Sequence, residues 1–199
     1  MEQPLSPTFP RLESERLLLV VPERGDAPRL LAYNQRNRVH LRPFSPPEPS
    51  GTSELEYWVS HVERLHREFS AGLSVPFRLV LRSDPSGPFV GAVNLTQICG
   101  GAFSACYLGY HLDFALVGQG LMSEALRAAI RHAFQDLRLH RLMANYVPSN
   151  RRSASVLARL GFTIEGYARE YLFIDGAWRD HVLTSLTNRA LSSPEPLRR

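Results

Sequence analysis

The chain has 199 residues, of which 44% are apolar and 21% are charged, and this composition is ordinary for one soluble globular domain. The formal net charge of +4 permits attraction to RNA or the ribosome but does not establish it. All 23 of the Lys and Arg positions are arginine, so chemistry that needs a lysine, such as a Schiff base or a Walker A loop, is excluded. We expect a single domain over residues 1–199, with a loose N-terminal arm at 1–12 and a loose C-terminal tail at 190–199.

The two cysteines, Cys99 and Cys106, match no metal-binding or redox spacing. So few thiols fit a reducing cytosol better than a secreted disulfide framework. No apolar run approaches the ~20 residues of a membrane span, and the Pro-rich, acidic start lacks the order of a signal peptide. We therefore expect a cytoplasmic protein with no metal ion and no membrane partner.

The first third of the chain predicts one strand and two helices. An apolar run at residues 16–21 predicts the strand, and residues 26–39 predict a helix with Pro28 in its first turn. Residues 42–51 hold four prolines and predict a loop that could bind the acceptor. Apolar residues at three- and four-residue steps predict the second helix at residues 53–69.

The remaining patterns predict most of a sheet. An antiparallel meander is expected at residues 75–81, 89–98 and 104–113. After it we expect a helix from Leu121, a strand at 141–147, a helix at 149–160 and a closing hairpin of 162–174 and 177–186. The crossover between 104 and 147 passes through a helix, so it predicts a parallel pair of strands. The predicted fold class is mixed α/β, with a mostly antiparallel sheet and helices on both faces.

The segment Val117–Gly120 lies between a predicted strand and a predicted helix. Its two glycines let the backbone approach a bulky anion, and the unpaired N–H groups of a helix start favour a pyrophosphate. Taken alone, a Gly-rich turn is more often only a turn. Two other phosphate-binding patterns are excluded, because the chain has no Gly-Lys-Ser/Thr and no G-x-G-x-x-G after its first strand.

Two strings strengthen the prediction of a coenzyme site. DFALVGQGLM begins at Asp113, and NRRSASVLARLGF begins at Asn150. Together they resemble the phosphate loop and the Asn helix of the Gcn5-related N-acetyltransferases (GNAT), although the first loop position is Ala115 instead of Gln or Arg. The order of predicted elements also matches that family from Glu15 to Thr187. The resemblance implies the GNAT fold, with its sheet splayed at the coenzyme cleft, and acetyl-coenzyme A (acetyl-CoA) as co-substrate.

The C-terminal half resembles one branch of that family more closely. The strings ACYLGY, HRLMANYVPSNRRS, LARLGF and EGYAREYLFIDGAWRDHVLT are similar in order and spacing to the RimJ-type ribosomal-protein alanine N-acetyltransferases. The N-terminal third matches only loosely, through ERLLL and HLRPF. The resemblance implies that the acceptor is the α-amino group of a protein, in this branch a ribosomal protein that begins with Ala.

The resemblance also implies a set of coenzyme-binding residues. Backbone groups near Tyr110 to Asp113 would hold the pantetheine arm and polarise the thioester, and Asn150 would hold the same arm. Arg152 could meet the coenzyme phosphates or could lie on a solvated helix face. The residues predicted to bind acetyl-CoA are Leu112, Asp113, Val117, Gly118, Gln119, Gly120, Leu121, Met122, Asn150, Arg152 and Ser153.

Two residues are candidates for proton transfer. Many GNAT enzymes place a Tyr acid seven residues after the Asn, but Leu157 occupies that position here. Ser153 resembles the Ser of RimL-like relatives and is the candidate that protonates the leaving thiolate; the alternative is a hydroxyl on the helix surface. Glu170 is the candidate base, and the alternative is an ordinary edge carboxylate that faces a neighbouring arginine.

Four residues are candidates for acceptor binding. Tyr110 and Tyr146 either line the pocket or are plain core aromatics. Asp180 and His181 either bind the acceptor N-terminus or form a buried polar pair between the last two strands. His111 titrates in a useful range near the expected cleft, but a cross-strand surface histidine is the more common case.

The expected chemistry is direct attack of an amine on the thioester in a ternary complex. An α-amino group has a pKa of about 7.7–8.0, so roughly a tenth of it is neutral at pH 7 and a modest base suffices. One alternative is a small-molecule amine acetyltransferase of the same fold, and another is a catalytically idle GNAT domain that binds ribosomes or RNA. Because the arginines are scattered, we expect no direct nucleic-acid contact, and we expect a monomer or homodimer.

Overall fold

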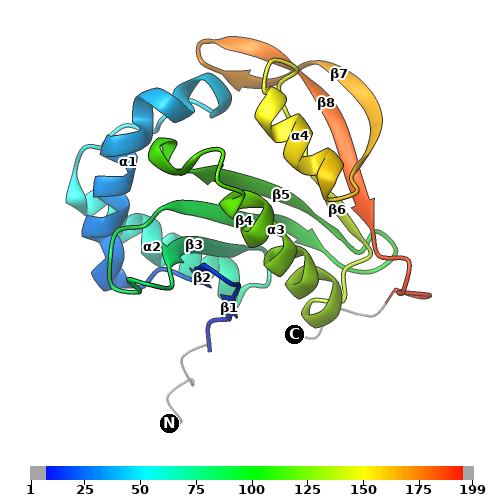
Figure 1. The fold of residues 1–199 in the computed structure, drawn as a ribbon, viewed down its shortest axis with the longest axis horizontal. Helices are drawn as coiled ribbons and strands as arrows, with labels where there is room; N and C mark the ends of the chain where they lie inside the picture. The colour runs from blue at the N-terminus through cyan, green and yellow to red at the C-terminus, as the bar shows by residue number, and fades with distance from the viewer. Residues whose placement is uncertain (1–7, 195–199) are drawn as a thin grey trace.

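The computed structural model describes residues 8–194, which form one eight-stranded sheet with helices on both faces (Figure 1). The strand order across the sheet is β1-β2-β3-β4-β5-β6-β8-β7. The strands are β1 (Arg11–Glu13), β2 (Leu17–Val20), β3 (Val75–Leu81), β4 (Gly91–Cys99), β5 (Ala105–Leu112), β6 (Arg141–Met143), β7 (Thr163–Ile174) and β8 (Ala177–Thr187). The α-helices are α1 (Ala27–Leu41), α2 (Leu55–Ser70), α3 (Leu121–Arg131) and α4 (Arg151–Arg159).

The sheet opens between β5 and β6. These strands are the parallel pair, and their register runs only from Ala105 opposite Arg141 to Tyr107 opposite Met143. Among the described residues, β5 has no strand partner on this side beyond Tyr107, because the chain after Met143 continues along β8 and Tyr146 bridges Val182. The expected mixed sheet with one parallel pair is therefore confirmed.

Each face of the sheet carries its own hydrophobic core. The larger core packs α3 and α4 against the sheet and includes Phe77, Leu126 and Leu157. The smaller core joins α1 and α2 to the opposite face and includes Leu30 and Val62. Figure 1 shows α3 in front of the strands and α2 behind them. Strand β3 is covered on both faces, and a strand buried in this way is expected to be apolar throughout. All residues of β3 except Arg78 are indeed apolar.

The start of the chain is more ordered than the sequence predicted. Arg11–Glu13 forms β1 and pairs with β2, so residues 11 and 12 do not belong to a loose arm. Phe9 also packs against the rings of His66 and Phe69. Residues 1–7 of the expected arm and residues 195–199 of the expected tail lie outside the described residues.

Two predicted elements differ in extent. The strand expected at 141–147 is paired continuously only over Arg141–Met143, since the opening of the sheet removes its partner beyond that point. The helix that begins at Leu121 continues after Arg131 into a π-helical turn at His132–Asp136. No helix among the described residues is both long enough and apolar enough to cross a bilayer.

Candidate active site

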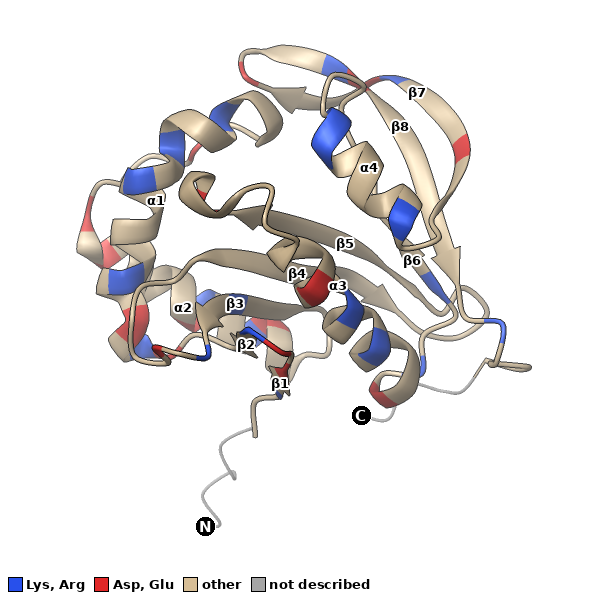
Figure 2. Ribbon diagram, in the orientation of Figure 1, with Lys and Arg blue, Asp and Glu red and all other residues tan. Residues whose placement is uncertain are grey.

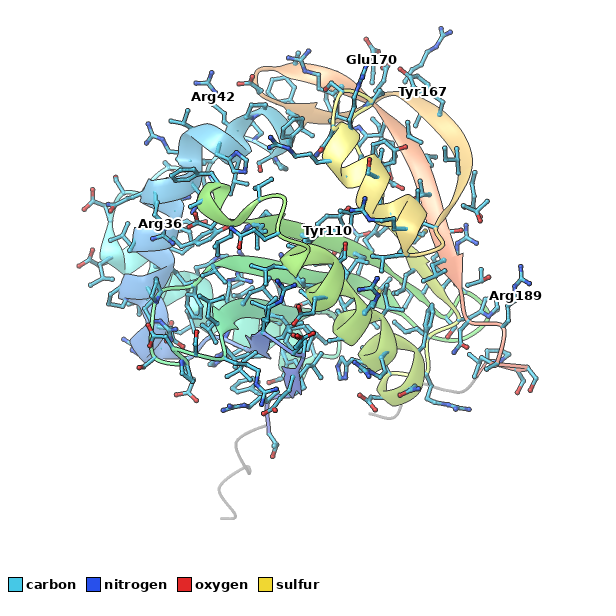
Figure 3. The ribbon with its side chains drawn as sticks, viewed as in Figure 1. Arg36, Arg42, Tyr110, Tyr167, Glu170 and Arg189 are labelled. Atoms are coloured by element: carbon cyan, nitrogen blue, oxygen red, sulfur yellow. The ribbon has the colours of Figure 1, made fainter. Side chains whose placement is uncertain are left out.

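Two hydroxyl groups connect the open end of β5 to α4. The phenol oxygen of Tyr110 lies 2.6 Å from Oγ of Ser153. Asn150 caps α4, because its Oδ1 accepts a hydrogen bond from the Ser153 amide at 3.1 Å. The pKa of Tyr110 is raised to about 12, because burial raises it by more than the hydrogen bond to Ser153 lowers it. The phenol therefore stays protonated at neutral pH and can donate to Ser153. Figure 3 shows Tyr110 in the middle of the molecule, beside α4.

The backbone before α3 is shaped for the close approach of a ligand. Gly118 and Gly120 have φ angles of +88° and +80°, in the left-handed region that favours glycine. A Cβ added at Gly118 would meet no atom within 4 Å, so the space beside it is open. Leu121 and Met122 are the first two residues of α3, and the amides of a first helical turn have no partners inside the helix. This cradle fits a diphosphate.

An ion pair holds this glycine loop against the start of β2. Glu124 of α3 accepts hydrogen bonds from Nε of Arg16 at 2.8 Å and from the Arg16 amide and the Ser14 hydroxyl at 2.6 Å each. Nη1 of Arg16 also donates to the carbonyl of Gln119 at 3.1 Å. Burial raises the pKa of Glu124, but these hydrogen bonds outweigh it and the pKa is lowered. Arg16 thus neutralises a carboxylate that would otherwise repel a phosphate near the loop.

The end of β5 is fastened to α1 through Asp113. Its Oδ2 accepts from Nε of Arg36 at 2.6 Å and from Nδ2 of Asn37 at 3.1 Å, and its Oδ1 accepts from the Ala115 amide at 3.0 Å. Burial raises the pKa of Asp113, but hydrogen bonds from Asn37, Arg36 and Ala115 outweigh it and the pKa is lowered. The side chain of Asp113 is therefore committed to the fold, and only main-chain groups near Leu112 remain for a coenzyme.

A cavity of about 660 Å³ lies on the other face of the sheet. Its walls come from α1, the Pro-rich segment after α1, α2, strands β3 to β5 and the turn between β7 and β8. An ion pair of 3.1 Å between Arg42 and Asp175 closes its rim, and Figure 3 labels Arg42 near the hairpin. The polar lining consists of Tyr33, Asn34, Arg38, Arg42, Ser45, Glu48, His61, Arg78, Asn94, His111 and Asp175.

His111 faces this cavity, whereas Tyr110, the preceding residue, faces α4. Consecutive strand residues point to opposite faces, so the open end of β5 contributes to both sides of the sheet. Nδ1 of His111 lies 2.8 Å from the hydroxyl of Tyr33. Burial and the positive charge of Arg78 lower the pKa of His111 to about 3, so the ring is neutral at pH 7. The preferred interpretation of His111 as a surface histidine is wrong.

Of the predicted residues of the hairpin, Glu170 and Asp180 lie on its outer part and His181 is buried. Glu170 is exposed at a bulge of β7, and its amide donates to Oδ1 of Asp180 at 2.9 Å. Asp180 also accepts from the Tyr167 hydroxyl at 2.7 Å, and the buried His181 packs against the ring of Tyr171. Figure 3 shows Glu170 and Tyr167 at the outer edge of the hairpin.

None of these predicted hairpin residues lines the cavity. Glu170 therefore does not line this cavity, and its role as the base stays a prediction. Asp180 joins β8 to β7 through exposed hydrogen bonds, and His181 instead lies near the carbonyl of Arg179, so the two do not form the buried polar pair of the alternative interpretation.

Of the other predicted residues, Tyr146 lies at the opening of the sheet, Arg152 lies on α4, and Val117 and Gln119 lie in the glycine loop. Tyr146 bridges Val182 of β8, and its proximity raises the pKa of Tyr110. Arg152 is exposed in the first turn of α4, and Figure 2 shows basic residues at both ends of that helix. Nε2 of Gln119 donates to the carbonyl of Ala115 at 3.3 Å. Val117 lies half-buried at the start of the glycine loop.

Sequence reasoning missed the polar lining of the cavity. Arg78 is the one available signal, because it lies within an otherwise apolar strand and arginine is seldom buried unless it is paired. Tyr33 and His61 lie on helices, where ordinary amphipathic patterns conceal them. Their approach to His111 and Arg78 depends on the packing of α1 and α2 against the sheet.

Comparison with known sequences places these features in a family context. The sequence profile of the acetyltransferase (GNAT) domain matches residues 16–163. The ribosomal protein uS5-alanine N-acetyltransferase of Escherichia coli (strain K12) is 42% identical over 178 residues, which cover 89% of this chain and 90% of that protein. The probable N-acetyltransferase YjcK of Bacillus subtilis (strain 168) is 32% identical and covers 83% of this chain and 91% of that protein.

Two solved structures share the fold over nearly the whole chain. The ribosomal-protein-S5-alanine acetyltransferase of Vibrio fischeri superposes with a TM-score of 0.86 at 35% identity, covering 94% of this chain and 100% of that one. Mycobacterium smegmatis RimJ in complex with CoA-disulfide gives a TM-score of 0.83 at 29% identity, covering 96% of this chain and 91% of that one.

Proposed function

The chain belongs to the GNAT acetyltransferase family, and from that premise we propose that it moves an acetyl group from acetyl-CoA to the N-terminal α-amino group of a ribosomal protein. The observation that carries the proposal is the 42% identity to a uS5-alanine N-acetyltransferase over about nine-tenths of both chains. The open end of β5, with a glycine cradle on one side and a cavity on the other, supports it. A ribosomal acceptor also favours a cytoplasmic location.

The glycine loop and α4 would hold acetyl-CoA, which supplies the acetyl group as an activated thioester. The amides of residues 117–122 would bind the diphosphate, since they lie at a helix N-terminus beside open space. Main-chain groups near Leu112 and the side chain of Asn150 would hold the pantetheine arm. Arg152, exposed in the first turn of α4, would meet a phosphate.

The acceptor would reach the opening of the sheet from the cavity side, where Tyr146 and β8 form one edge. The cavity is not acidic: three arginines line it, and both of its carboxylates, Glu48 and Asp175, already have partners. A pocket for a small polyamine would need free carboxylates. The charge of the cavity therefore favours a peptide acceptor over a small-molecule amine.

Proton transfer would use Ser153 on the leaving side. Ser153 lies within hydrogen-bond distance of a phenol that stays protonated, so Tyr110 can donate to Oγ while Ser153 directs its own proton to the departing sulfur. The attacking amine needs no strong base, because roughly a tenth of an α-amino group is neutral at pH 7. Holding amine and thioester in line then supplies much of the rate.

Incubation with acetyl-CoA and a library of N-terminal peptides, followed by mass spectrometry, tests the proposal. We expect one acetyl group on the α-amine of peptides that begin with Ala. Acetylation of polyamines or other small amines alone would replace the proposal with the small-molecule alternative. Coenzyme binding without transfer to any amine would favour an idle domain that binds ribosomes.

A further inference from the structure

The cavity contains a buried guanidinium that no carboxylate neutralises. Arg78 of β3 is only 8% exposed. Its Nη1 donates to Oδ1 of Asn94 at 3.0 Å and to the carbonyl of Phe77 at 3.1 Å. No Asp or Glu among residues 8–194 forms an ion pair with it. Burying a charge is costly unless it is paired, so this arrangement points to a partner that arrives with a ligand.

Two nitrogens of Arg78 remain available to such a ligand. Nε and Nη2 make no hydrogen bond to the described part of the chain, and neither is sealed from solvent. Arg78 lines the cavity, so these donors are reachable from it. A guanidinium with two free N–H directions matches a planar carboxylate.

The other charged groups of the cavity do not compensate Arg78. Glu48 accepts from Nδ2 of Asn34 at 3.0 Å, and Asp175 pairs with Arg42 at the rim. Arg38 is exposed and adds further positive charge.

The two histidines of the cavity are uncharged at neutral pH. Burial and the nearby charge of Arg78 lower the pKa of His61 to about 4 and that of His111 to about 3. The deep part of the cavity therefore carries one fixed positive charge at pH 7, that of Arg78.

We infer that Arg78 binds a carboxylate of the acceptor, so that the enzyme selects N-terminal segments with an Asp or Glu side chain close to the reacting amine. This inference rests on the proposed function and adds a specificity determinant to it. The carboxylate would pair with Nε and Nη2 of Arg78 while Asn94 continues to hold Nη1. The acceptor then brings the counter-charge that the folded chain lacks.

The register of the sheet sets the distance between Arg78 and the open edge of β5. Arg78 pairs with Ala92, and Ala92 pairs with His111, so the three residues lie in one row on one face. Two strand spacings of about 4.8 Å separate β3 from β5, or roughly 10 Å. An extended peptide advances about 3.3 Å per residue, so an amine at the open edge of β5 places its second to fourth residues near Arg78. Gly109 leaves room for the segment, because a Cβ there would meet no atom within 4 Å.

Matched peptides test the inference on the wild-type enzyme. Amidated peptides beginning with Ala would carry a single Gln→Glu change at position 2, 3, 4 or 8, and kcat/KM would be measured for each. We expect a preference of about 10- to 100-fold for Glu at one position from 2 to 4 and none at position 8, as charge-assisted hydrogen bonds allow. Short Ala peptides with a free C-terminal carboxylate are measured separately, to distinguish recognition of that group from recognition of a Glu side chain.

Two variants assign the preference to Arg78. Arg78→Met keeps the apolar stem and should reduce the Glu/Gln ratio of kcat/KM to about one, mainly through a higher KM for the Glu peptide, whereas Arg78→Lys should keep part of the ratio. Arg67→Met, an exposed arginine of α2 outside the cavity, is the matched control and should keep the ratio. Calorimetry with coenzyme A, which binds on the other face, reports whether each variant is folded.

Each outcome decides the inference. Equal kcat/KM for Glu and Gln at positions 2 to 4 overturns it and leaves the proposed function standing. A preference that survives in folded Arg78→Met, or that occurs only with a free C-terminal carboxylate, also overturns it. Failure to acetylate any peptide overturns the inference and the proposed function together.

Discussion

The hydroxyl oxygens of Tyr110 and Ser153 lie 2.6 Å apart and bridge the open end of β5 to the start of α4. Neither residue is near the other in sequence, and no strand pairing joins these elements beyond Tyr107. The contact places two donors beside the gap in which the thioester is expected. It also gives Ser153 a fixed orientation that an isolated serine on a helix would lack.

Ser153→Ala should lower kcat by about 100-fold, the range of one general acid, with little effect on coenzyme affinity. The cap of α4 survives, because Asn150 accepts from the backbone amide of residue 153. Steady-state kinetics and calorimetry would measure both quantities. Ser155→Ala removes a hydroxyl from the same helix that bonds only the Arg151 carbonyl, and it should leave kcat unchanged. Equal kcat for wild type and Ser153→Ala would make Ser153 a bystander.

Gly118→Val should abolish measurable binding of acetyl-CoA while the fold survives. The left-handed φ of +88° costs a residue with a Cβ roughly 1–2 kcal/mol, and the new side chain would occupy the open space beside the loop. Gly101→Val imposes a similar strain, at φ +65°, in the turn before β5 and serves as the control. Calorimetry that gives wild-type affinity for Gly118→Val would contradict the assignment of the loop.

Glu124→Gln and Arg16→Met should each weaken coenzyme affinity about 5- to 30-fold, equivalent to ~1–2 kcal/mol. Arg16→Met removes the hydrogen bond to the carbonyl of Gln119, and Glu124→Gln removes the charge that holds Arg16 in place. The double variant should lose little more than each single variant, since both remove the same ion pair. Calorimetry on the wild type, the two single variants and the double variant completes this double-mutant cycle. Additive losses would show that the two residues act independently on the loop.

Asp113→Asn should destabilise the protein by about 2 kcal/mol at pH 7, since it removes the charge that pairs with Arg36 in a largely buried site. The pKa of Asp113 is lowered in the folded state. Its stabilising contribution is therefore complete above the unfolded pKa of about 3.9 and is lost as pH falls through the folded pKa. Urea unfolding at pH 7 and pH 3 should show the difference between wild type and variant shrinking. A constant difference would refute the role of the charge.

Local patterns were sufficient for most of the secondary structure. Helix α2 has apolar residues at helical spacing, and the turns around Gly161 and Gly176 have the residues that such turns require. The glycine loop was also recognisable, because its conformation depends on two residues without side chains. The boundary of the strand after Arg141 was not predictable, because its pairing ends where the sheet opens.

The sequence by itself determined the family, the order of elements and the glycine loop, since each depends on neighbours along the chain. The tertiary structure decided which side chains meet. It placed Tyr110 against Ser153, turned His111 toward Tyr33, and left Glu170 outside the cavity. These outcomes depend on strand register and on the packing of α1 and α4 against opposite faces, and a one-residue shift in register would exchange the faces of Tyr110 and His111.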